Sequence, residues 1–307
     1  MAAFIVRRVL WTIPVVLLII LFTFLLVRAI ATGPFAPANY PRPVQTTFHL
    51  DQACYEQYAF YVKSVFTLDF GPTLAFTDRT VNDIIINQYP NSLLLGLLAL
   101  AWAVAIGIPA GMIAALRPGS VLDYMVMVLS SIGFAFPAFL VATLLIYYVA
   151  LKLEWVPTSG WPSEHWQLDR SVILPSLTLS LVPMAWFARL LRGAMLETMG
   201  QDYVKAARAK GLRAQQVIIR HVLKNSLIPL VTVAGPLIGY LITGSFVVEW
   251  IFSVPGIGRY FITAVFARDY FVVLGITIVL SVTIIVANLI VDLAYFVLDP
   301  RTRDAHL

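Results

Sequence analysis

The stretch "DYVKAARAKGLRAQQVIIRHVLKN", residues 202–225, is basic, rich in helix-forming residues and bordered on both sides by long apolar runs. The run before it, Val172–Ala188, and the run after it, Leu227–Val248, contain no charged side chain. Charged residues are disfavoured in the hydrocarbon of a bilayer and collect in the segments that connect its spans. The pattern therefore predicts a membrane protein in which residues 202–225 lie outside the lipid.

The composition of the whole chain supports this prediction. Of its 307 residues, 60% are hydrophobic and 12% are charged, whereas a soluble globular protein has about 25% charged residues. The net charge of +5 is compatible with nucleic-acid binding. The basic residues gather between apolar runs, however, so we expect contact with membrane lipid and no nucleic-acid partner. Cys54 is the only cysteine, which excludes an internal disulfide bond and a cysteine-based metal or redox motif.

Six uncharged apolar segments are long enough to cross a hydrocarbon core of about 30 Å. They are Val9–Val27, Leu93–Leu116, Tyr124–Leu151, Val172–Ala188, Leu227–Val248 and Phe271–Val291. The predicted fold class is therefore an all-α integral membrane protein with six transmembrane helices. The fourth segment is short and contains Pro175 and Pro183, so we expect it inside the bundle rather than facing lipid. Pro137 marks an expected irregularity in the third.

The basic residues also predict the orientation of the chain. With the N-terminus inside, the inner segments hold most of the 21 Lys and Arg residues, and the positive-inside rule then places both termini in the cytoplasm. The first apolar run is longer than the core of a cleaved signal peptide, about 7–15 residues, so we expect an uncleaved first span. The predicted organisation is a first span in 1–30, an outer region in 31–92, a five-helix transmembrane core in 93–298 with an inner loop in 189–226, and a cytoplasmic tail in 299–307.

Motifs for catalysis are absent from the sequence. It contains no G-x-x-x-x-G-K-[ST] phosphate loop, no H-E-x-x-H and no G-x-S-x-G, so we expect no nucleotide hydrolysis or other enzymatic activity in this chain. The histidines at 49, 165, 221 and 306 are scattered, and we expect no metal site. Asp292 is the clearest candidate for an acid embedded in the membrane near a span, and it stands alone there, which argues against an intramembrane hydrolase.

A polar stripe follows the last predicted span. Thr277, Ser281, Asn288 and Asp292 fall within about 60° of one another on a helix with 100° per residue. The interpretation that we favour is hydrogen bonding between helices, which small polar side chains provide in membranes. The alternative is that the stripe lines a substrate pathway.

The stretch 202–225 predicts a short helix, a glycine break and a second helix that returns to the membrane. Tyr203, Ala206, Ala207 and Lys210 have the spacing of one helical face, and the two alanines leave a shallow surface on it. Gly211 is suited to the left-handed turn that ends a helix. A solvated connector is the alternative, but long loops in compact proteins are usually functional or disordered, so we interpret the face as a docking site for a cytoplasmic partner.

At this point the sequence resembles a known family. "KAARAKG" followed by "VIIRHVLKN" is similar to the EAA loop of membrane subunits of ATP-binding-cassette importers, with Ala206, Ala207 and Gly211 matching and Lys205 in place of the usual glutamate. Further segments resemble the B-type permease subunit of oligopeptide, dipeptide and nickel importers, most closely its oligopeptide branch. They are "DFGPTLAFTDRTVNDII" (69–85), "GIPAGMIAAL" (107–116), "FPAFLVATLLIYYVALKLEWVPTSGW" (136–161), "GSFVVEWIFSVPGIGRYFITAVFARDY" (244–270) and "LDPRTR" (298–303). Residues 31–66 depart from that pattern.

The resemblance implies a type I importer bundle in a prokaryotic cell membrane, forming half of a pathway with a second, homologous permease. It implies two cytoplasmic ATPase subunits that bind ATP and Mg²⁺ and dock on Tyr203, Ala206, Ala207, Lys210 and Gly211. It also implies an external binding protein that delivers peptide. This chain itself would bind no cofactor.

Between the last two spans, "EWIFSVPGIGRYFITAVFARDY" (249–270) is too short to cross the membrane, and "VPGIG" predicts a turn. Two interpretations of this segment remain. It is a re-entrant or surface helix that meets the binding protein, with Glu249 and Arg259 as contacts, or it is a lid packed on the bundle. The alternatives for the whole chain are a permease for nickel or another small cargo, an ion-coupled secondary transporter, and a membrane scaffold.

Overall fold

The computed structural model describes residues 2–29, 52–76, 78–162, 166, 168–242 and 246–298. The expected outer segment 31–51 and tail 299–307 lie outside the described residues, as do His49, His165 and His306. The described part of the chain is helical and contains no β-strand, since the one antiparallel bridge, between Pro72 and Thr80, is isolated. The prediction of an all-α fold is confirmed.

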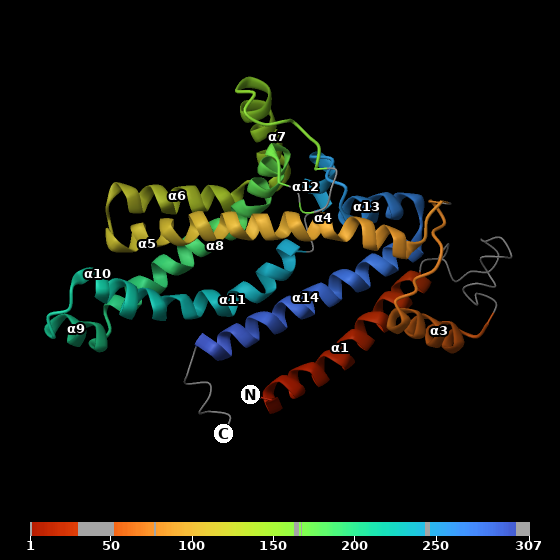
Figure 1. Cartoon of the computed structure of the whole chain (residues 1–307), viewed down its shortest axis with the longest axis horizontal. Helices are drawn as coiled ribbons and strands as arrows, with labels where there is room; N and C mark the ends of the chain where they lie inside the picture. Colours follow the sequence, from red (N-terminus) through yellow and green to blue (C-terminus); the bar gives the residue numbers. More distant parts are fainter. Residues whose placement is uncertain are drawn as a thin grey trace.

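The long helices are α1 (Ala2–Ala29), α4 (Val81–Trp102), α8 (Ile173–Met199), α11 (Lys224–Ile242) and α14 (Tyr270–Leu298). The shorter segments are α3 (Cys54–Thr67), the π-helical turn η2 (Ala103–Gly107), α5 (Ile108–Leu116), α6 (Val121–Ala135), α7 (Ala138–Leu145), the π-helical η3 (Ile146–Lys152), the 3-10 turn η4 (Arg170–Val172), α9 (Asp202–Ala209), α10 (Ala214–Val217), the π-helical η5 (Ile218–Leu223), α12 (Phe246–Ile251) and α13 (Ile257–Ala267). Figure 1 shows α9 and α10 at one end of the molecule and α3 and α13 at the other.

Among the described residues, five helical segments are long and apolar enough to cross a membrane, and a bent pair of helices makes up to six. The five are Leu10–Ala29, Val81–Leu116, Arg170–Met199, Ala214–Ile251 and Tyr270–Leu293. The apolar window of Arg170–Met199 is 61% buried, the highest share of the five, which confirms that this span lies inside the bundle. Its helix continues to Met199 rather than ending with the apolar run at Ala188, because charged residues mark where hydrocarbon ends and not where a helix ends.

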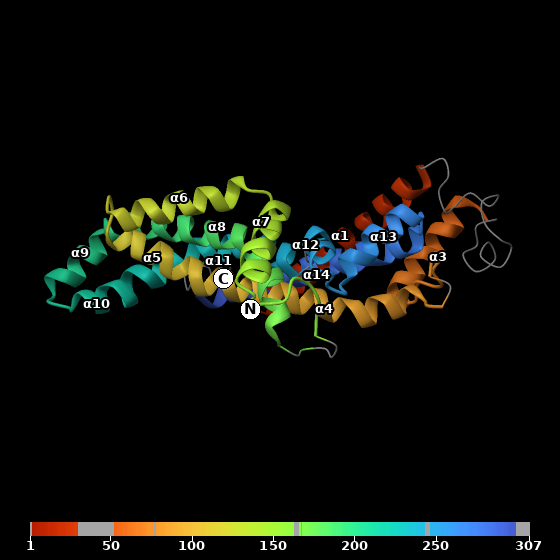
Figure 2. The ribbon, with the colours of Figure 1, turned by 90° about the horizontal axis from the view of Figure 1, so that it is seen from above.

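The predicted third span is sharply bent. The axes of α6 and of α7 with η3 differ by 109°, and Figure 2 shows α7 turned across the direction of α6. Phe136 ends α6 with an extended backbone, ψ 125°, because a residue before proline is disfavoured in the helical region. Pro137 then begins the next helix. The expected irregularity at Pro137 is therefore a change of direction rather than a kink within one straight span.

Two glycines bring α5 and η2 into direct contact with α8. A Cβ atom on Gly107 would lie 2.7 Å from the carbonyl oxygen of Met184, and one on Gly111 would lie 2.5 Å from that of Ala188. Only glycine allows this approach, which is a common way for helices to pack in membranes.

An ion pair joins α6 to the same helix. Arg192 of α8 donates two hydrogen bonds to the buried carboxylate of Asp123, at 2.5 and 2.7 Å. Such a two-point pair fixes geometry as well as charge.

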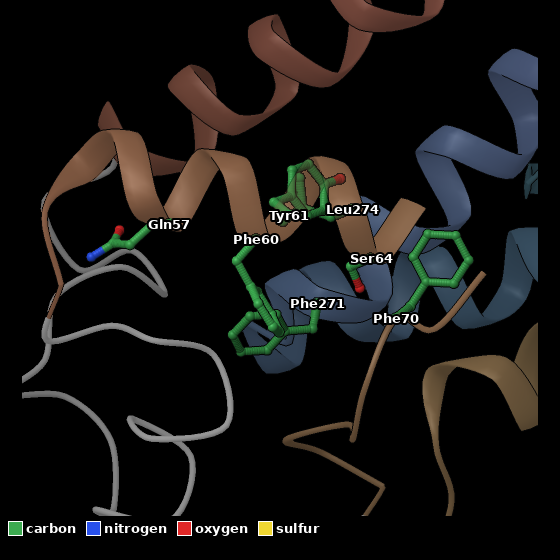
Figure 3. Close-up of a pocket in the computed structure, with 7 residues that line it drawn as sticks. All are labelled: Gln57, Phe60, Tyr61, Ser64, Phe70, Phe271 and Leu274. Carbon is green, nitrogen blue, oxygen red and sulfur yellow. The ribbon is translucent and has the colours of Figure 1, made fainter. Parts of the chain in front are cut away.

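At the opposite end, α3 packs across α1 and α14. Arg28 donates a hydrogen bond of 2.7 Å to Gln57, and the ring of Phe24 packs edge-on against Tyr58, with the ring centres 5.5 Å apart. Burial raises the pKa of the Tyr61 hydroxyl. Figure 3 shows the small cavity left here, lined by Gln57, Phe60, Tyr61, Ser64, Phe70, Phe271 and Leu274, with a volume of about 20 Å³. A space of that size holds about one water molecule, so it is not a substrate site.

The close approach of α5 to α8 predicts opposite effects for two alanine substitutions. We expect Gly111→Ala to lower the melting temperature of the purified protein in detergent, because the added methyl group must displace a helix backbone, at a cost of about 1–3 kcal/mol. Gly193→Ala in α8 is the control, since a Cβ there meets nothing within 4 Å, and alanine in a helix is favoured over glycine by about 0.5–1 kcal/mol. Equal melting temperatures for the two variants would contradict the contact.

Candidate functional site

The stretch 202–225 forms two helical segments separated by a glycine turn, as predicted. α9 ends at Ala209, and α10 begins at Ala214 and continues through η5 into α11. Gly211 has φ +77°, a left-handed conformation that glycine adopts without a steric cost. The chain therefore leaves α8, makes one short helix, reverses and returns to the bundle.

One face of α9 is buried in its own chain. Val204 is 0% exposed and Ala207 is 6% exposed, whereas Ala206 is exposed. The prediction that both alanines lie on the outward face is wrong for Ala207. At 3.6 residues per turn, Ala207 lies about 60° from Val204, whose aliphatic side chain enters the core, whereas Ala206 lies about 160° from it.

The buried face joins α9 to both neighbouring spans. Val204 and Ala207 belong to a cluster of buried side chains from α8, α10, η5 and α11 that includes Leu191, Met195, Val217, Val222 and Leu230. Two hydrogen bonds between side chains add to this packing. Asn225 Nδ2 donates to the hydroxyl of Tyr203 at 3.0 Å, and Ser226 Oγ donates to Thr198 Oγ1 at 3.1 Å. The helix α9 is therefore packed against side chains of both α8 and α11.

The outward surface of α9 combines a small-residue centre with positive charge. Ala206 and Ala209 are exposed between Lys205, Arg208 and Lys210. Lys205 also forms an ion pair with Asp202 at 2.9 Å, with both side chains largely exposed, so it contributes little to stability. We call Lys205, Ala206, Arg208, Ala209, Lys210 and Gly211, with Tyr203 at the edge, the candidate docking surface.

At the end of the molecule that holds α13 (Figure 1), Glu249 has a different place from the one expected. Its side chain is 0% exposed, so the prediction that it contacts an external protein is wrong for this structure. Its Oε1 accepts a hydrogen bond of 2.8 Å from Ser92, and its Oε2 accepts one of 3.2 Å from the backbone N–H of Arg259. Ser92 Oγ in turn accepts from the N–H of Ile257 at 3.0 Å. Together they cap the first N–H groups of α13, where a negative charge is favoured.

Two glycines make room for this carboxylate. A Cβ atom on Gly256 would lie 2.4 Å from Glu249 Oε2, and one on Gly258 would lie 2.8 Å from it. Asn91 extends the network, because it donates to the carbonyl oxygen of Pro255 at 2.8 Å and accepts from Trp161 Nε1 at 3.2 Å. We call α12, the turn 252–256 and α13 the outer hairpin, after the side of the membrane predicted for it from the sequence, and this network fastens it to α4.

A second buried carboxylate, which the sequence analysis did not single out, holds the other end of the hairpin. Asp269 is 0% exposed and lies between α13 and α14. Its Oδ2 accepts from the N–H groups of Leu74 and Ala75 at 2.7 and 2.9 Å, and its Oδ1 accepts from Val272 N at 3.3 Å. Its position directly before an apolar helix was the available signal, since aspartate is a preferred N-cap residue. For Glu249 the signal was the Gly-x-Gly pair at 256 and 258.

The other predicted contacts remain predictions. Arg259 is exposed, with its guanidinium 5.9 Å from the ring centre of Trp250. In the polar stripe of α14, Thr277 and Ser281 donate to carbonyl oxygens of their own helix, at 2.7 Å each. Asn288 and Asp292 instead line a cavity of about 230 Å³ with Trp11 and Thr12 of α1. Among the described residues, no three His, Cys, Asp or Glu side chains are placed to hold a metal ion.

This arrangement of buried spans and a docked short helix agrees with a family match. Residues 107–304 match the model of the binding-protein-dependent transport system inner membrane component. The chain belongs to this permease family. The match covers more than half of the sequence and includes α9 and the outer hairpin.

Relatives of full length extend the match over the whole permease. The dipeptide transport system permease protein DppB of Bacillus subtilis is 39% identical over 99% of this chain and 98% of its own. The oligopeptide transport system permease proteins OppB of Haemophilus influenzae and Escherichia coli are 36% and 38% identical, over 99% of this chain and 100% of theirs. The family resemblance inferred from the sequence is confirmed.

A solved structure supports the fold. The chain is similar to one from the inward-facing MetNI methionine ABC transporter, with a TM-score of 0.58 and 17% sequence identity over 70% of this chain and 96% of that one. At this identity the likeness concerns the fold alone. The permease therefore has the type I importer fold, as predicted, and is a multi-span membrane protein.

The two alanines of α9 predict different effects on stability. We expect Ala207→Leu to lower the melting temperature of the purified permease, because the cluster around Val204 has no room for a larger side chain and overpacking costs about 1–3 kcal/mol. Ala206→Leu is the matched control, since the same substitution there points to an exposed surface. A loss of stability in Ala206→Leu equal to that in Ala207→Leu would contradict the placement of the buried face.

The outer hairpin predicts a graded loss of stability at Glu249. Glu249→Ala leaves buried donors without partners, each at a cost of about 1–3 kcal/mol, whereas Glu249→Gln keeps one acceptor oxygen in place. We expect limited proteolysis of the hairpin to be fastest in the alanine variant, intermediate in the glutamine variant and slowest in the unchanged protein. Equal cleavage rates in all three would show that the carboxylate does not fasten the hairpin.

Proposed function

We propose that this chain is the permease subunit of an ATP-driven importer that takes up peptides through a pathway shared with a second, homologous permease. The observation that carries the proposal is the seat of α9, which is fixed to α8 and α11 from inside and exposes a small-residue surface outside. A helix held in this way would pass the movement of a bound partner to both spans. The relatives belong to dipeptide and oligopeptide transport systems, which supports peptide as the cargo.

The energy would enter through two ATPase subunits that bind ATP and Mg²⁺ and receive the docking surface in a cleft. Because Val204 and Ala207 are packed against both spans, movement of that cleft would shift α8 and α11 as one body. The positive charges around Ala206 favour an acidic rim on the ATPase cleft, since complementary charge fixes the register of an interface. This chain would contribute the helix that passes on the movement, and no catalytic group.

The orientation follows from this docking. α9 would lie in the cytoplasm of a prokaryotic cell with both termini, and the outer hairpin on the opposite side of the membrane. Exposed side chains of the hairpin, Arg259 among them, would meet an external protein that delivers peptide. The fastening of the hairpin to α4 by Glu249 and Ser92 supports this role, because a docking platform must be rigid to select its partner.

The docking surface is tested in the complete complex, reconstituted with its partner permease, ATPase subunits and binding protein. We expect Ala206→Asp to reduce peptide uptake about tenfold or more, because a charge at the centre of a helix–cleft contact removes a dominant part of the binding energy. Gly211→Val should act likewise, since a non-glycine residue at positive φ costs about 1–2 kcal/mol. Membrane insertion and melting temperature of Ala206→Asp should remain unchanged.

The controls separate this proposal from its alternatives. Gly193→Ala, on the exposed side of α8, should leave uptake and ATP hydrolysis as they are. Normal coupling of hydrolysis to uptake in Ala206→Asp would reject the docking surface. Uptake of nickel and not of peptide by the unchanged complex would reassign the cargo, and transport by this chain alone, driven by an ion gradient, would reject the importer.

A further inference from the structure

A cleft with a largely apolar lining lies between α4 and α8. Its volume is about 410 Å³, within the range of about 300–1,000 Å³ that small-molecule sites occupy. Its lining residues come from α4, η2, the segment before α8 and the start of α8, and they are Leu98, Ala101, Trp102, Ala105, Leu168, Asp169, Val172, Ile173 and Ser176.

The helix contacts described above explain why the cleft exists. At Gly107 and Gly111 the backbones of η2 and α5 touch α8 directly, so no space remains between them. Near the start of α8, the exposed alanines 101 and 105 have short side chains that leave the space beside Trp102 unfilled. Ala105 lies within the π-helical turn η2, and π-helical turns within α-helices are frequent at functional sites.

The polar groups of the cleft lie at its mouth and on one wall. Asp169 Oδ1 accepts from the backbone N–H of Ser171 at 2.7 Å and from the hydroxyl of the same residue. Within the described chain Oδ2 accepts no hydrogen bond, and Asp169 is exposed. On the wall, the indole N–H of Trp102 donates to Ser176 Oγ at 3.2 Å. This hydrogen bond orients the indole ring of Trp102. The N–H is used in it, so the π-system of the ring is the part that is left to contact a ligand.

These groups select a cation with an apolar extension. A carboxylate with a free oxygen pairs with an ammonium group, and an aromatic face attracts the same cation. The remaining lining is aliphatic and suits an uncharged body. The amino-terminal end of a peptide has this chemistry, with a primary ammonium group on a short chain that carries side chains.

We propose that the α4–α8 cleft is a subsite for the amino terminus of the transported peptide, with Asp169 binding the ammonium group at the mouth and Trp102 lying beside the first residue. The proposal rests on the proposed function. It assigns to this chain a part in selecting cargo, in addition to its part in transmitting force.

Affinity labelling of the complete complex tests the subsite. The background is Cys54→Ser, which removes the only cysteine, and Ala105→Cys places a thiol on the wall of the cleft. The probes are two tripeptides with a thiol-reactive group on the second side chain, one with a free amino terminus and one acetylated. The vesicles contain phosphatidylglycerol and phosphatidylcholine, which carry no primary amine. We expect the free probe to label Ala105→Cys about tenfold faster than the acetylated probe, the factor typical of a hydrogen bond to a charged group.

Two variants give the matched controls. Asp169→Asn should remove the difference between the probes without unfolding the mouth, since asparagine also accepts from Ser171 N as a cap. Ile113→Cys, exposed on α5 and outside the cleft, should react with both probes at one slow rate. Equal labelling of Ala105→Cys by both probes, or an unchanged difference in Asp169→Asn, would overturn the proposal.

A lipid arm and an uptake arm separate the remaining explanations. If phosphatidylethanolamine, added to the vesicles, blocks labelling by the free probe, then a lipid amine occupies the cleft and the peptide assignment is overturned. Peptide uptake by the unchanged complex is measured in parallel. Failure of uptake would reject the proposed function, whereas normal uptake without amine-dependent labelling would reject the subsite alone.

Discussion

A backbone that crosses hydrocarbon has no water to satisfy its N–H and C=O groups, and this constraint governs the whole molecule. Each crossing segment must be helical, and its helix ends must find other partners. Helices in lipid also gain little from burying apolar side chains against one another, so close packing decides how they meet. Gly107 and Gly111 supply that packing between α5 and α8. The two-point pair of Asp123 and Arg192 then holds α6 to the same helix.

The same constraint explains the polar clusters at the two ends of the bundle. At the end that holds the outer hairpin, buried Glu249 and Asp269 accept hydrogen bonds from N–H groups that begin α13 and α14, groups that water would satisfy in a soluble protein. At the other end, the reversal between α9 and α10 relies on the left-handed conformation of Gly211. Both ends of the bundle are thus held by specific contacts of the chain with itself.

The sequence was sufficient for the class of fold, because apolar run length and the placement of basic residues follow directly from the bilayer as solvent. It also indicated the helix–glycine–helix stretch and the family. The sequence was not sufficient where residues of the same type lie in different environments. Ala206 and Ala207 are alike in the sequence, and only the burial of Val204 shows which of them faces inward. Glu249 looked like a surface charge, because its partners, Ser92 and the N-terminus of α13, are distant in the chain. The bend at Pro137 was visible as a proline but not as an angle.

The contact between Gly111 and Ala188 lies partway along α8, between the cleft at one end and α9 at the other. With the backbones touching there, a tilt of α8 against α5 would pivot about that contact. If α8 moved as one rigid helix, a displacement of its α9 end in one direction would swing the end beside the cleft in the other direction.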